Sequence, residues 1–475
     1  MPPWPEPDGD AAAGEHRTES MTTIYSTPKS WPSILLARAG KPGKAGRAGA
    51  PGAASTLADP SEALDAAMAS GAFAGLRRAV HDLGPTGTIA MIAASGLRGR
   101  GGAGFPTGEK WRLCAETDAP RRYVVANGYG ADPSAQTDRT LIETDPFGVI
   151  EGVAIAAFAV GADDAFIAIR AEATESIRRL EAAIGAAEDA GLIGPSMLGS
   201  GLGPTIRVRP VQGAYMLGEE TVLLKALEGK RGQPEQRPPH PAERGLFGMP
   251  TVVQNVQTLA AVPWIVVNGP ESFAAIGSDA SPGTILVGVR GPGGSGVAEV
   301  PLGTPLREIV GLAGASKDLK AVLVGGPSGG LLPAELLDTP YEFDALRAVG
   351  AHIGSGSVVV ADSRACVVDL ARLLTRFCAD EACGKTIPCR IGTRRISEIG
   401  DRMAIGTPRP TDLQLLADLS ADVVASALCD HERLATLPYS SGMRYFRSEL
   451  DEHILRSNCP AGVCRPIAVA AGAAH

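Results

Sequence analysis

Cysteine placement constrains the fold of this chain more than any other feature of its sequence. Eight cysteines are present, and seven of them lie between Cys366 and Cys464, with only Cys114 elsewhere. In a long chain without features of secretion, such clustering favours metal ligation over disulfide bonds. We therefore expect the C-terminal part of the chain to fold around a metal site.

Composition argues against two large classes of function. The net charge of -8 gives no support to nucleic-acid binding, which usually requires a basic surface. No apolar run approaches the roughly 18 residues that cross a bilayer, so direct membrane insertion is not expected. Residues 1–60 are rich in Pro, Ala and Gly and predict a disordered extension without a secretory signal. We expect a cytoplasmic protein that reaches the inner face of a membrane only through partner subunits.

Strand-like and helix-like patterns alternate between residues 61 and 250. Short apolar runs at 123–126 and 165–169 predict buried strands. Apolar or amphipathic stretches at 149–160 and 171–190 predict helices that follow them. Such alternation is typical of an α/β domain with a mostly parallel sheet.

Two further regions are expected downstream. Strand-like runs separated by Gly and Pro clusters predict a small α+β domain at residues 270–340. Helical periodicity predicts a bundle at residues 345–456 that holds the clustered cysteines, followed by a cysteine-containing tail at 457–475. With 475 residues, 44% of them hydrophobic, the chain is long enough for two or three domains.

A glycine-rich loop from Ser95 to Gly108 is the first candidate binding site. Glycines let the backbone curl around a ligand and offer its N–H groups to a phosphate. Arg98, Arg100 and Lys110 add positive charge to this segment. A simple turn is the alternative interpretation.

Three other polar residues are candidates for a site. Glu219 and Glu220 stand at the start of a predicted helix that ends at Gly229. A helix dipole stabilises negative charge there, so helix stabilisation is the alternative to a catalytic role. Asn127 ends a predicted strand, where α/β proteins bind ligands, although such an Asn also caps its own turn.

The clustered cysteines form two groups. Cys383 and Cys389 lie close in sequence, and Cys429 follows after a longer interval. Thiolates are soft ligands that suit the iron of an iron–sulfur cluster. The alternative interpretation is that these cysteines are reduced and buried and bind no metal. The second group, His453, Cys459 and Cys464, can hold zinc or help to hold a cluster, unless this tail is disordered.

Several of these motifs resemble one protein family. Residues 99–111 resemble, nearly letter for letter, the flavin mononucleotide loop of the flavoprotein subunit of NADH:quinone oxidoreductase (respiratory complex I). Residues 218–221 with 227–232 resemble a second element of that family, and residues 383–390 with Cys429 resemble its 4Fe-4S element. The family includes the β subunits of soluble NAD-linked formate dehydrogenases and of multimeric hydrogenases, in which an element like residues 459–464 recurs.

The resemblance covers about Ser61 to Cys464 and implies an architecture and a mechanism. It implies a Rossmann-like FMN/NAD domain, a small ubiquitin-like (SLBB-like) α+β domain and a C-terminal helical bundle carrying the iron–sulfur site. It also implies hydride transfer between NAD(H) and FMN, in which the flavin does the chemistry, and then passage of single electrons to a 4Fe-4S cluster. Electrons would leave to partner subunits of ferredoxin-like or thioredoxin-like iron–sulfur type.

The resemblance also implies individual site residues. Glu219 and Glu220 would be catalytic, beside the flavin ring and the nicotinamide, and Cys383, Cys389 and Cys429 would ligate the cluster. The implied cofactor-binding residues are Gly99, Arg100, Gly101, Gly102, Ala103, Gly104, Phe105, Lys110, Asn127, Asp132, Gly218, Glu219, Glu220, Gln254, Asn255 and Thr258.

The sequence departs from the family pattern around the NADH site. Tyr129 and Gly130 replace an Asp and a Glu, and Asp132 is a shortened stand-in for another Glu. His240 replaces an aromatic Phe, while Gln254 and Gln257 replace an Asn and a Glu. Amides and apolar groups do not offer charged acceptors to ribose hydroxyls. A degenerate relay or scaffold subunit that no longer oxidises NADH is therefore the alternative function.

The cluster motif also departs from the family, because Thr386 stands where the family has its middle cysteine. The fourth ligand would then be a hydroxyl, a water molecule or Cys378. Conversion to a three-iron form, or loss of the cluster, is the other outcome of such altered ligation.

Overall fold

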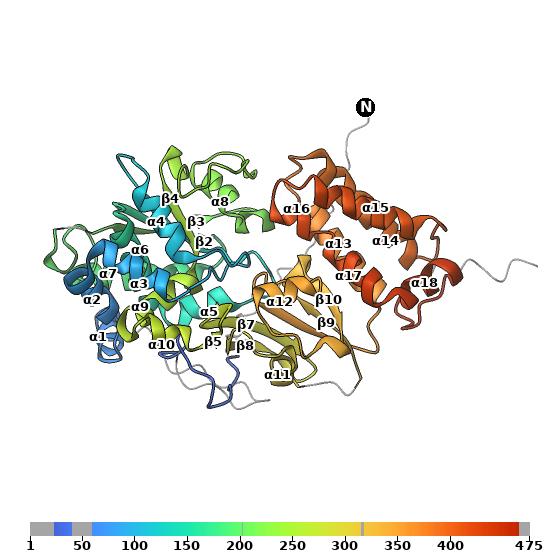
Figure 1. Cartoon of the computed structure of the whole chain (residues 1–475), viewed down its shortest axis with the longest axis horizontal. Helices are drawn as coiled ribbons and strands as arrows, with labels where there is room; N and C mark the ends of the chain where they lie inside the picture. Colours follow the sequence, from blue (N-terminus) through green and yellow to red (C-terminus); the bar gives the residue numbers. More distant parts are fainter. Residues whose placement is uncertain (1–22, 40–58, 202, 315–317, 465–475) are drawn as a thin grey trace, which may run out of the picture.

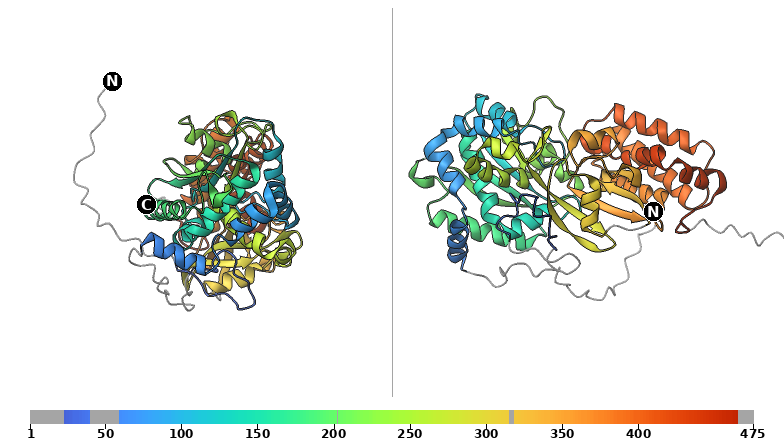
Figure 2. Two further views of the ribbon diagram at one scale, coloured as in Figure 1. Left: turned by 90° about the vertical axis from the view of Figure 1, so that its left-hand side faces the viewer. Right: turned by 60° about the horizontal axis from the view of Figure 1, so that its bottom comes forward.

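The structure, a computed structural model, describes residues 23–39, 59–201, 203–314 and 318–464. It contains an α/β region, a smaller region built on a mixed sheet, and a helical region (Figure 1). The right-hand view of Figure 2 shows the mixed sheet between the other two regions. Among the described residues, no helix combines the length and apolar character needed to cross a lipid bilayer.

The α/β region is built on four parallel strands in the order β3-β2-β1-β4. Side chains alternate between two hydrophobic clusters: Val124 belongs to one, and Tyr123 and Val125 belong to the other. Burial of both faces is expected of a parallel sheet. The four strands are β1 Tyr123–Gly128, β2 Asp164–Arg170, β3 Thr205–Val211 and β4 Thr251–Asn255.

Helices cover both faces of this sheet. The helices and short turns of this region are α1 Pro60–Ala69, α2 Ala74–Arg78, η1 Ala79–Leu83, α3 Gly84–Ala94, α4 Thr107–Glu116, α5 Thr137–Thr144, α6 Pro146–Val160, α7 Thr174–Asp189, η2 Met197–Gly199, η3 Tyr215–Gly218, α8 Glu220–Leu227, η4 Leu246–Gly248, α9 Val256–Asn268 and α10 Pro270–Ala274. Each strand and helix predicted from the sequence in this region is present.

Helix α6 shows how local sequence and packing agree. The side chain of Asp145 accepts the N–H of Gly148 at its start, and Gly161 adopts a left-handed conformation at its end. A Cβ atom built on Gly152 would lie 2.0 Å from the carbonyl oxygen of Leu259 in α9. Only glycine permits this close approach of α6 and α9, which buries α6 on every side.

The middle region contains a five-stranded sheet of order β10-β9-β11-β7-β8, in which only β11 and β7 pair in parallel. Because β11 belongs to it, the boundary expected at residue 345 falls inside this region. Its elements are β5 Gly277–Ser278, β6 Ser281–Pro282, β7 Thr284–Gly291, β8 Gly294–Pro301, α11 Leu306–Leu312, β9 Leu319–Val324, η5 Gly326–Ser328, β10 Gly330–Pro333, η6 Ala334–Leu336, α12 Phe343–Ala348 and β11 Ser357–Asp362.

The last region is helical, as the sequence predicted. Its hydrophobic cluster joins α13, α14, α15, α17 and α18 to the face of the mixed sheet through Ala321 and Leu331. Its elements are α13 Val367–Asp380, η7 Pro388–Thr393, α14 Arg394–Ala404, α15 Asp412–Ala425, α16 Asp430–Leu434, α17 Leu437–Tyr445 and α18 Arg447–Arg456. The predicted fold class, with a parallel-sheet α/β region and a helical C-terminal region, is confirmed.

The prediction of disorder through residue 60 is wrong for residues 23–39. The backbone N–H groups of Ile34 and Leu35 donate to Oε1 of Glu299 in β8, at 2.8 and 2.9 Å. The backbone of Tyr25 pairs with Val297, and its ring is buried. The partner Glu299 lies 265 residues away from Ile34, so composition within the segment could not reveal it. Residues 1–22 and 40–58 lie outside the described residues.

Candidate functional site

The glycine-rich loop forms a tight turn between α3 and α4. The N–H of Gly99 donates to the carbonyl of Phe105 at 2.8 Å, which closes the turn. Gly102 and Gly104 have positive φ angles and pack against Gly354 and Phe343 of the mixed-sheet region. Gly101 is different: a Cβ there would meet only an ordinary contact with Asn255, and no described residue accepts its N–H. The chain itself therefore does not require glycine at position 101.

Arg100 does not bring its charge to the open side of this loop, contrary to expectation. The residue is 2% exposed, and its guanidinium donates to the carbonyls of Pro282, Thr284 and Arg98 at 2.6, 3.0 and 3.0 Å. Burial and repulsion by Arg98 lower its pKa to about 9. Arg98 likewise donates to the carbonyl of Gly104 in the loop and to that of Ala280 outside it. Both arginines tie the loop to its surroundings, because buried carbonyls need donors.

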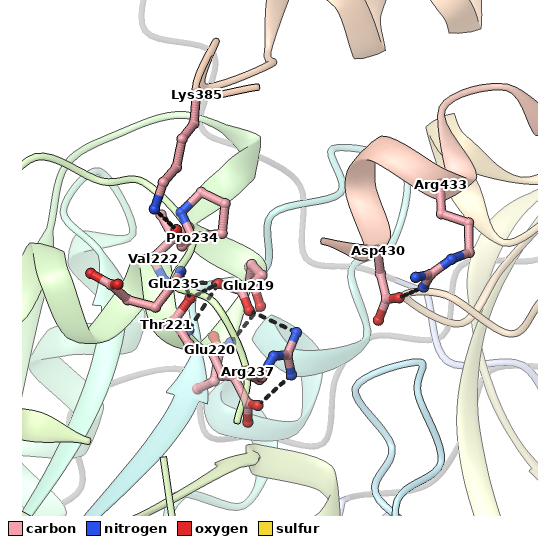
Figure 3. Close-up of polar contacts among 12 residues, drawn as sticks. Glu219, Glu220, Thr221, Val222, Pro234, Glu235, Arg237, Lys385, Asp430 and Arg433 are labelled. Carbon is pink, nitrogen blue, oxygen red and sulfur yellow. Dashed lines mark hydrogen bonds and ion pairs between the residues drawn. The ribbon is translucent and has the colours of Figure 1, made fainter. Parts of the chain in front are cut away.

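Lys110, in α4 directly after the loop, reaches the acidic pair Glu219 and Glu220. Its Nζ lies 3.0 Å from Oε2 of Glu220 and donates to the carbonyl of Val253. Arg237 lies 2.8 Å from the other Glu220 oxygen and 3.3 Å from Glu219 (Figure 3). Burial raises the pKa of Glu220, but Lys110 and Arg237 outweigh burial, so the pKa lies below its usual value. Glu220 is thus held as a carboxylate between two cations.

Glu219 has the helix-capping role that was the alternative interpretation. Its Oε2 accepts the backbone N–H groups of Thr221 and Val222, both at 2.9 Å, at the start of α8. Burial raises its pKa despite these hydrogen bonds. The two neighbouring glutamates therefore differ: one fixes the helix start, and the other faces Lys110.

Asn127 connects β1 to the segment that carries Glu219 and Glu220. Its amide donates to the carbonyl of Gly218 at 3.1 Å, while its oxygen accepts the N–H of Tyr129. Asp132 is buried, accepts from Ser134, and also bonds the hydroxyl of Ser355 in the mixed-sheet region. Asn127 lies at the carboxyl end of β1, whereas Asp132 anchors its loop to the neighbouring region.

Tyr129 is a packed residue of the same loop. It is 2% exposed, and its hydroxyl donates to the carbonyl of Gly213 at 2.6 Å. The guanidinium carbon of Arg170 lies 4.8 Å from the ring centroid. The position that carries an acid in the resembling family is thus part of the hydrophobic core here.

Residues at the end of β4 and the start of α9 support the glycine-rich loop. Gln254 bonds Trp111 at 2.8 Å and Thr107 at 3.0 Å, and Thr258 accepts the N–H of Arg100 at 2.8 Å. Asn255 caps α9 and donates to Asp138 at 2.7 Å.

Gln257 also donates to Asp138, at 2.8 Å, and its oxygen accepts the N–H of Leu286. Burial raises the pKa of Asp138 to about 6. Sequence reasoning missed Asp138, since nothing in the sequence pairs it with residues more than 100 positions away.

The three expected cluster ligands lie in one part of the helical region. Cys389 and Cys429 are each 5% exposed, and Cys383 is partly buried. Burial, followed by the negative charges of Glu432, Cys429 and Cys383, raises the pKa of Cys389 to about 12. Cys383 packs against the hydrophobic cluster that contains Cys429, and Glu432 lies in the helix that follows Cys429. Three thiols and a carboxylate are a donor set that fits iron.

Thr386 and Cys378, the two residues that the sequence offered as a fourth ligand, each have a hydrogen-bond partner already. The hydroxyl of Thr386 donates to Oε1 of Glu432 at 2.8 Å. Cys378 is fully buried in α13, and its Sγ lies 3.6 Å from the carbonyl of Pro327. Glu432 was not among the residues singled out from the sequence.

The cysteine region adjoins the acidic pair. Cys429 packs in the same hydrophobic cluster as Leu217 and Val222, which flank that pair. Burial and nearby negative charges, including that of Glu219, raise the pKa of Cys429 to about 11. Lys385 of the cysteine loop donates to the carbonyl of Pro234, which leads to Arg237 (Figure 3). The two halves of the candidate site are therefore in contact.

A second group of cysteines gathers elsewhere in the helical region. One ligand atom from each of Cys366, His453, Cys459 and Cys464 lies within 4.8 Å of the others. His453 Nδ1 also lies 2.8 Å from the carbonyl of Glu449. Sequence reasoning found three of these four residues and missed Cys366, which precedes α13 and lies 87 residues from His453. Residues 457–464 of the tail are described and close on this group, whereas 465–475 lie outside the described residues.

Two family models match the chain. Residues 92–264 match the Nuo51 FMN-binding domain, and residues 369–453 match the NADH-ubiquinone oxidoreductase-F iron-sulfur binding region. The first contains the glycine loop and the acidic pair, and the second contains Cys383, Cys389 and Cys429.

Curated relatives align along most of the chain. The NADP-reducing hydrogenase subunit HndC of Solidesulfovibrio fructosivorans is 40% identical over 411 residues, which are 86% of this chain and 83% of that protein. The F-type subunit of the NADH-quinone oxidoreductase of Streptomyces coelicolor is 39% identical over 406 residues, 85% of this chain and 90% of that protein.

A solved structure of NAD+-reducing [NiFe]-hydrogenase in the H2-reduced state matches with a TM-score of 0.74 at 36% identity. The match covers 81% of this chain and 64% of the hydrogenase chain, slightly less than two thirds of its length. The chain belongs to the family of the FMN-binding flavoprotein subunit of NADH-quinone oxidoreductase. It is accordingly an FMN- and iron–sulfur-type electron-transfer subunit, and its relatives are subunits of multi-subunit oxidoreductases. The family resemblance seen in the sequence is confirmed.

Proposed function

We propose that this chain passes electrons from NADH to partner subunits, with FMN held by residues 99–105 and a cluster held at Cys383, Cys389 and Cys429. The observation that carries this proposal is the packing of Cys429 in one hydrophobic cluster with Leu217 and Val222, which flank the acidic pair. Electron transfer from a flavin to a cluster requires the two to be neighbours. FMN, when bound, accepts the hydride and releases single electrons.

The roles of individual residues follow from their contacts. The N–H of Gly101 is available to the flavin phosphate, with positive charge from Lys110 nearby. Asn127 keeps Gly218 and the acidic pair at a fixed distance from β1. Glu220, held ionised by Lys110 and Arg237, supplies an acceptor for the ribose or carboxamide of NADH. Glu219 keeps the start of α8 in place beneath it.

In this proposal four residues support the site indirectly, through the residues that they contact: Asp132, Gln254, Asn255 and Thr258. Thr258 holds the backbone of the loop, and Gln254 fixes Trp111 and Thr107 behind it. Asp132 ties its loop to Ser355. The burial of Tyr129 favours an altered NADH pocket and keeps the relay or scaffold subunit as the second candidate function.

The deciding experiment is anaerobic purification of the full chain after iron and FMN supplementation. Flavin and iron are quantified, and absorption spectra are recorded before and after NADH. Bleaching of the flavin band by NADH supports the dehydrogenase. Bound flavin that NADH cannot reduce, but dithionite can, supports the relay or scaffold subunit instead.

We also propose a structural zinc site at Cys366, His453, Cys459 and Cys464. Three thiolates and one imidazole form a closed set for tetrahedral zinc, with no open position for substrate. The carbonyl of Glu449 orients the imidazole through Nδ1, as is usual for histidine ligands. Such an ion would fasten residues 459–464 to the start of α13.

The remaining parts of the proposal concern the surroundings of the chain. We propose that the electron acceptors are iron–sulfur subunits of ferredoxin-like or thioredoxin-like type. The complex would lie in the cytoplasm, peripheral to the inner face of a membrane when partners bring it there. Copurification of a tagged chain from its own cells, followed by identification of the retained subunits, tests both statements.

A further inference from the structure

The structure pairs the residue that breaks the cluster motif with a buried carboxylate. Thr386 lies between Cys383 and Cys389, and its hydroxyl donates to Oε1 of Glu432 at 2.8 Å. Glu432 lies in α16, three residues after Cys429. A hydroxyl and a carboxylate therefore meet where the three candidate ligand segments converge.

Glu432 is a buried carboxyl group with no ion-pair partner among the described residues. Its side chain is 1% exposed, yet no Lys, Arg or His in the described residues forms an ion pair with it. Its other oxygen accepts the N–H of Leu428 at 2.9 Å, so its known partners are neutral donors. Burial of a carboxylate is costly unless a cation or a metal ion compensates. Metal ligation would compensate for the burial of this group.

The two hydrogen bonds also fix where the carboxylate points. The N–H of Leu428 holds Oε2 against the turn that carries Cys429, and Thr386 holds Oε1 toward the Cys383 loop. Lone pairs remain on Oε1, because a carboxylate oxygen accepts more than one bond. Oε1 therefore lies beside the position that a thiolate at residue 386 would otherwise occupy.

We propose that the cluster of this chain is held by Cys383, Cys389 and Cys429 and, at its fourth iron, by the carboxylate of Glu432. Thr386 is a positioning residue that orients this carboxylate. The inference rests on the proposed function, because it requires a cluster at these cysteines. A hard oxygen ligand holds cluster iron less firmly than a soft thiolate. The fourth iron is therefore the one that leaves first.

Oxidation by ferricyanide tests how firmly the fourth iron is held. Ferricyanide takes one electron from an oxidised four-iron cluster, one ferrous ion leaves, and an oxidised three-iron cluster remains. Added ferrous ion and one electron from a reductant reverse the step. Electron paramagnetic resonance detects the three-iron form directly, independently of any activity.

The experiment compares full-length variants after anaerobic reconstitution with iron and sulfide. The variants are Glu432→Gln, Thr386→Val, Thr386→Cys and, as a control on an exposed carboxylate of α14, Glu398→Gln. Measured quantities are iron per chain, the three-iron signal after ferricyanide, and the ferrous concentration that half-restores the four-iron form.

The unaltered chain and Glu398→Gln should bind four irons and lose one on oxidation. Glu432→Gln should contain the three-iron form from the outset, or require at least about tenfold more ferrous ion for restoration. Thr386→Val should weaken restoration less than Glu432→Gln, and Thr386→Cys should resist loss of iron.

Equal iron affinity in Glu432→Gln and the unaltered chain, with Thr386→Cys forming a normal cluster, would overturn this inference and leave the proposed function standing. Failure of every variant, Thr386→Cys included, to assemble a cluster would overturn both. Circular dichroism of each variant distinguishes loss of iron from loss of fold.

Discussion

Lys110 and Glu220 form an ion pair, with Nζ and Oε2 3.0 Å apart, that joins α4 to α8 across the carboxyl end of β4. The pair links the two segments that carry most of the family resemblance, although they lie 110 residues apart. Arg237 completes the arrangement from a third segment. Glu220 is therefore fixed in position by the chain itself, so in its proposed role as an acceptor for NADH little ordering would remain to be done on binding.

Glu220→Gln should preserve flavin binding and weaken NADH oxidation. The amide retains the size of the side chain but loses one charged acceptor, which costs about 1.5–3 kcal/mol, or roughly ten- to hundredfold in rate. Steady-state NADH oxidation with ferricyanide as acceptor measures this. Glu235→Gln is the matched control, since Glu235 pairs with Lys225 at the surface. An unchanged rate in Glu220→Gln would contradict the assignment.

Gly101→Trp should abolish flavin retention while the protein still folds. The backbone at Gly101 has no positive φ, and a Cβ there meets only one ordinary contact, so the loop does not need glycine for its own sake. A large side chain would occupy the space beside the free N–H. Flavin per chain and the melting temperature are compared with those of Gly185→Trp, in α7, where nothing lies within 4 Å of the added Cβ. Full flavin occupancy in Gly101→Trp would refute the site.

Tyr129→Asp should destabilise the protein rather than restore NADH oxidation. The substitution supplies the acid found in the family, but it removes a buried ring and places a charge in a hydrophobic cluster. A cost of about 3–5 kcal/mol is expected from the lost packing alone. Tyr129→Phe removes only the hydrogen bond to Gly213 and should cost about 1 kcal/mol. Denaturant unfolding measures both, and faster NADH oxidation by a stable Tyr129→Asp would show that the core tolerates the acid.

Glu151 should make the protein less stable as the pH rises toward neutrality. Burial raises its pKa from 4.5 to about 7, although it accepts the N–H groups of Phe73 and Leu76. A raised pKa means that the fold favours the protonated form. Below about pH 4.5 the ionisation of Glu151 does not lower the free energy of unfolding. As the pH rises to about 7, the free energy of unfolding falls by about 3 kcal/mol.

Denaturant unfolding between pH 5 and 8 tests this in Glu151→Gln, which cannot titrate. Its unfolding free energy should vary less with pH than that of the unaltered chain. Some dependence should remain, because burial also raises the pKa of Asp138. Identical pH profiles for the two proteins would show that Glu151 does not titrate in this range.

Removal of zinc should loosen the C-terminal segment and leave the flavin in place. Cys459→Ser and Cys464→Ser each remove one of the four proposed ligands, so zinc content should fall from one per chain toward zero. Limited proteolysis should then cleave near residues 457–464. Cys114→Ser, a buried cysteine of α4, is the control and should keep its zinc. Equal zinc content in all three variants would refute the site.

Much of the architecture followed from local patterns in the sequence. Apolar runs marked β1 and β2, and Gly229 marked the end of α8, because strand burial and helix ends depend on neighbouring residues. The glycine loop and the cysteines Cys383, Cys389 and Cys429 were likewise recognisable, since their spacing is a property of the chain itself.

Only the tertiary structure decided which side chains meet. The guanidinium of Arg100 is buried because carbonyls of the mixed-sheet region accept its hydrogen bonds. Glu219 caps its own helix, whereas Glu220 forms an ion pair with Lys110. Cys366 contacts His453, which lies 87 residues away, and Thr386 donates a hydrogen bond to Glu432, which lies 46 residues away. Such contacts depend on how separate elements pack together. Sequence spacing therefore indicated the types of site proposed for this protein, and packing determined which residues complete each one.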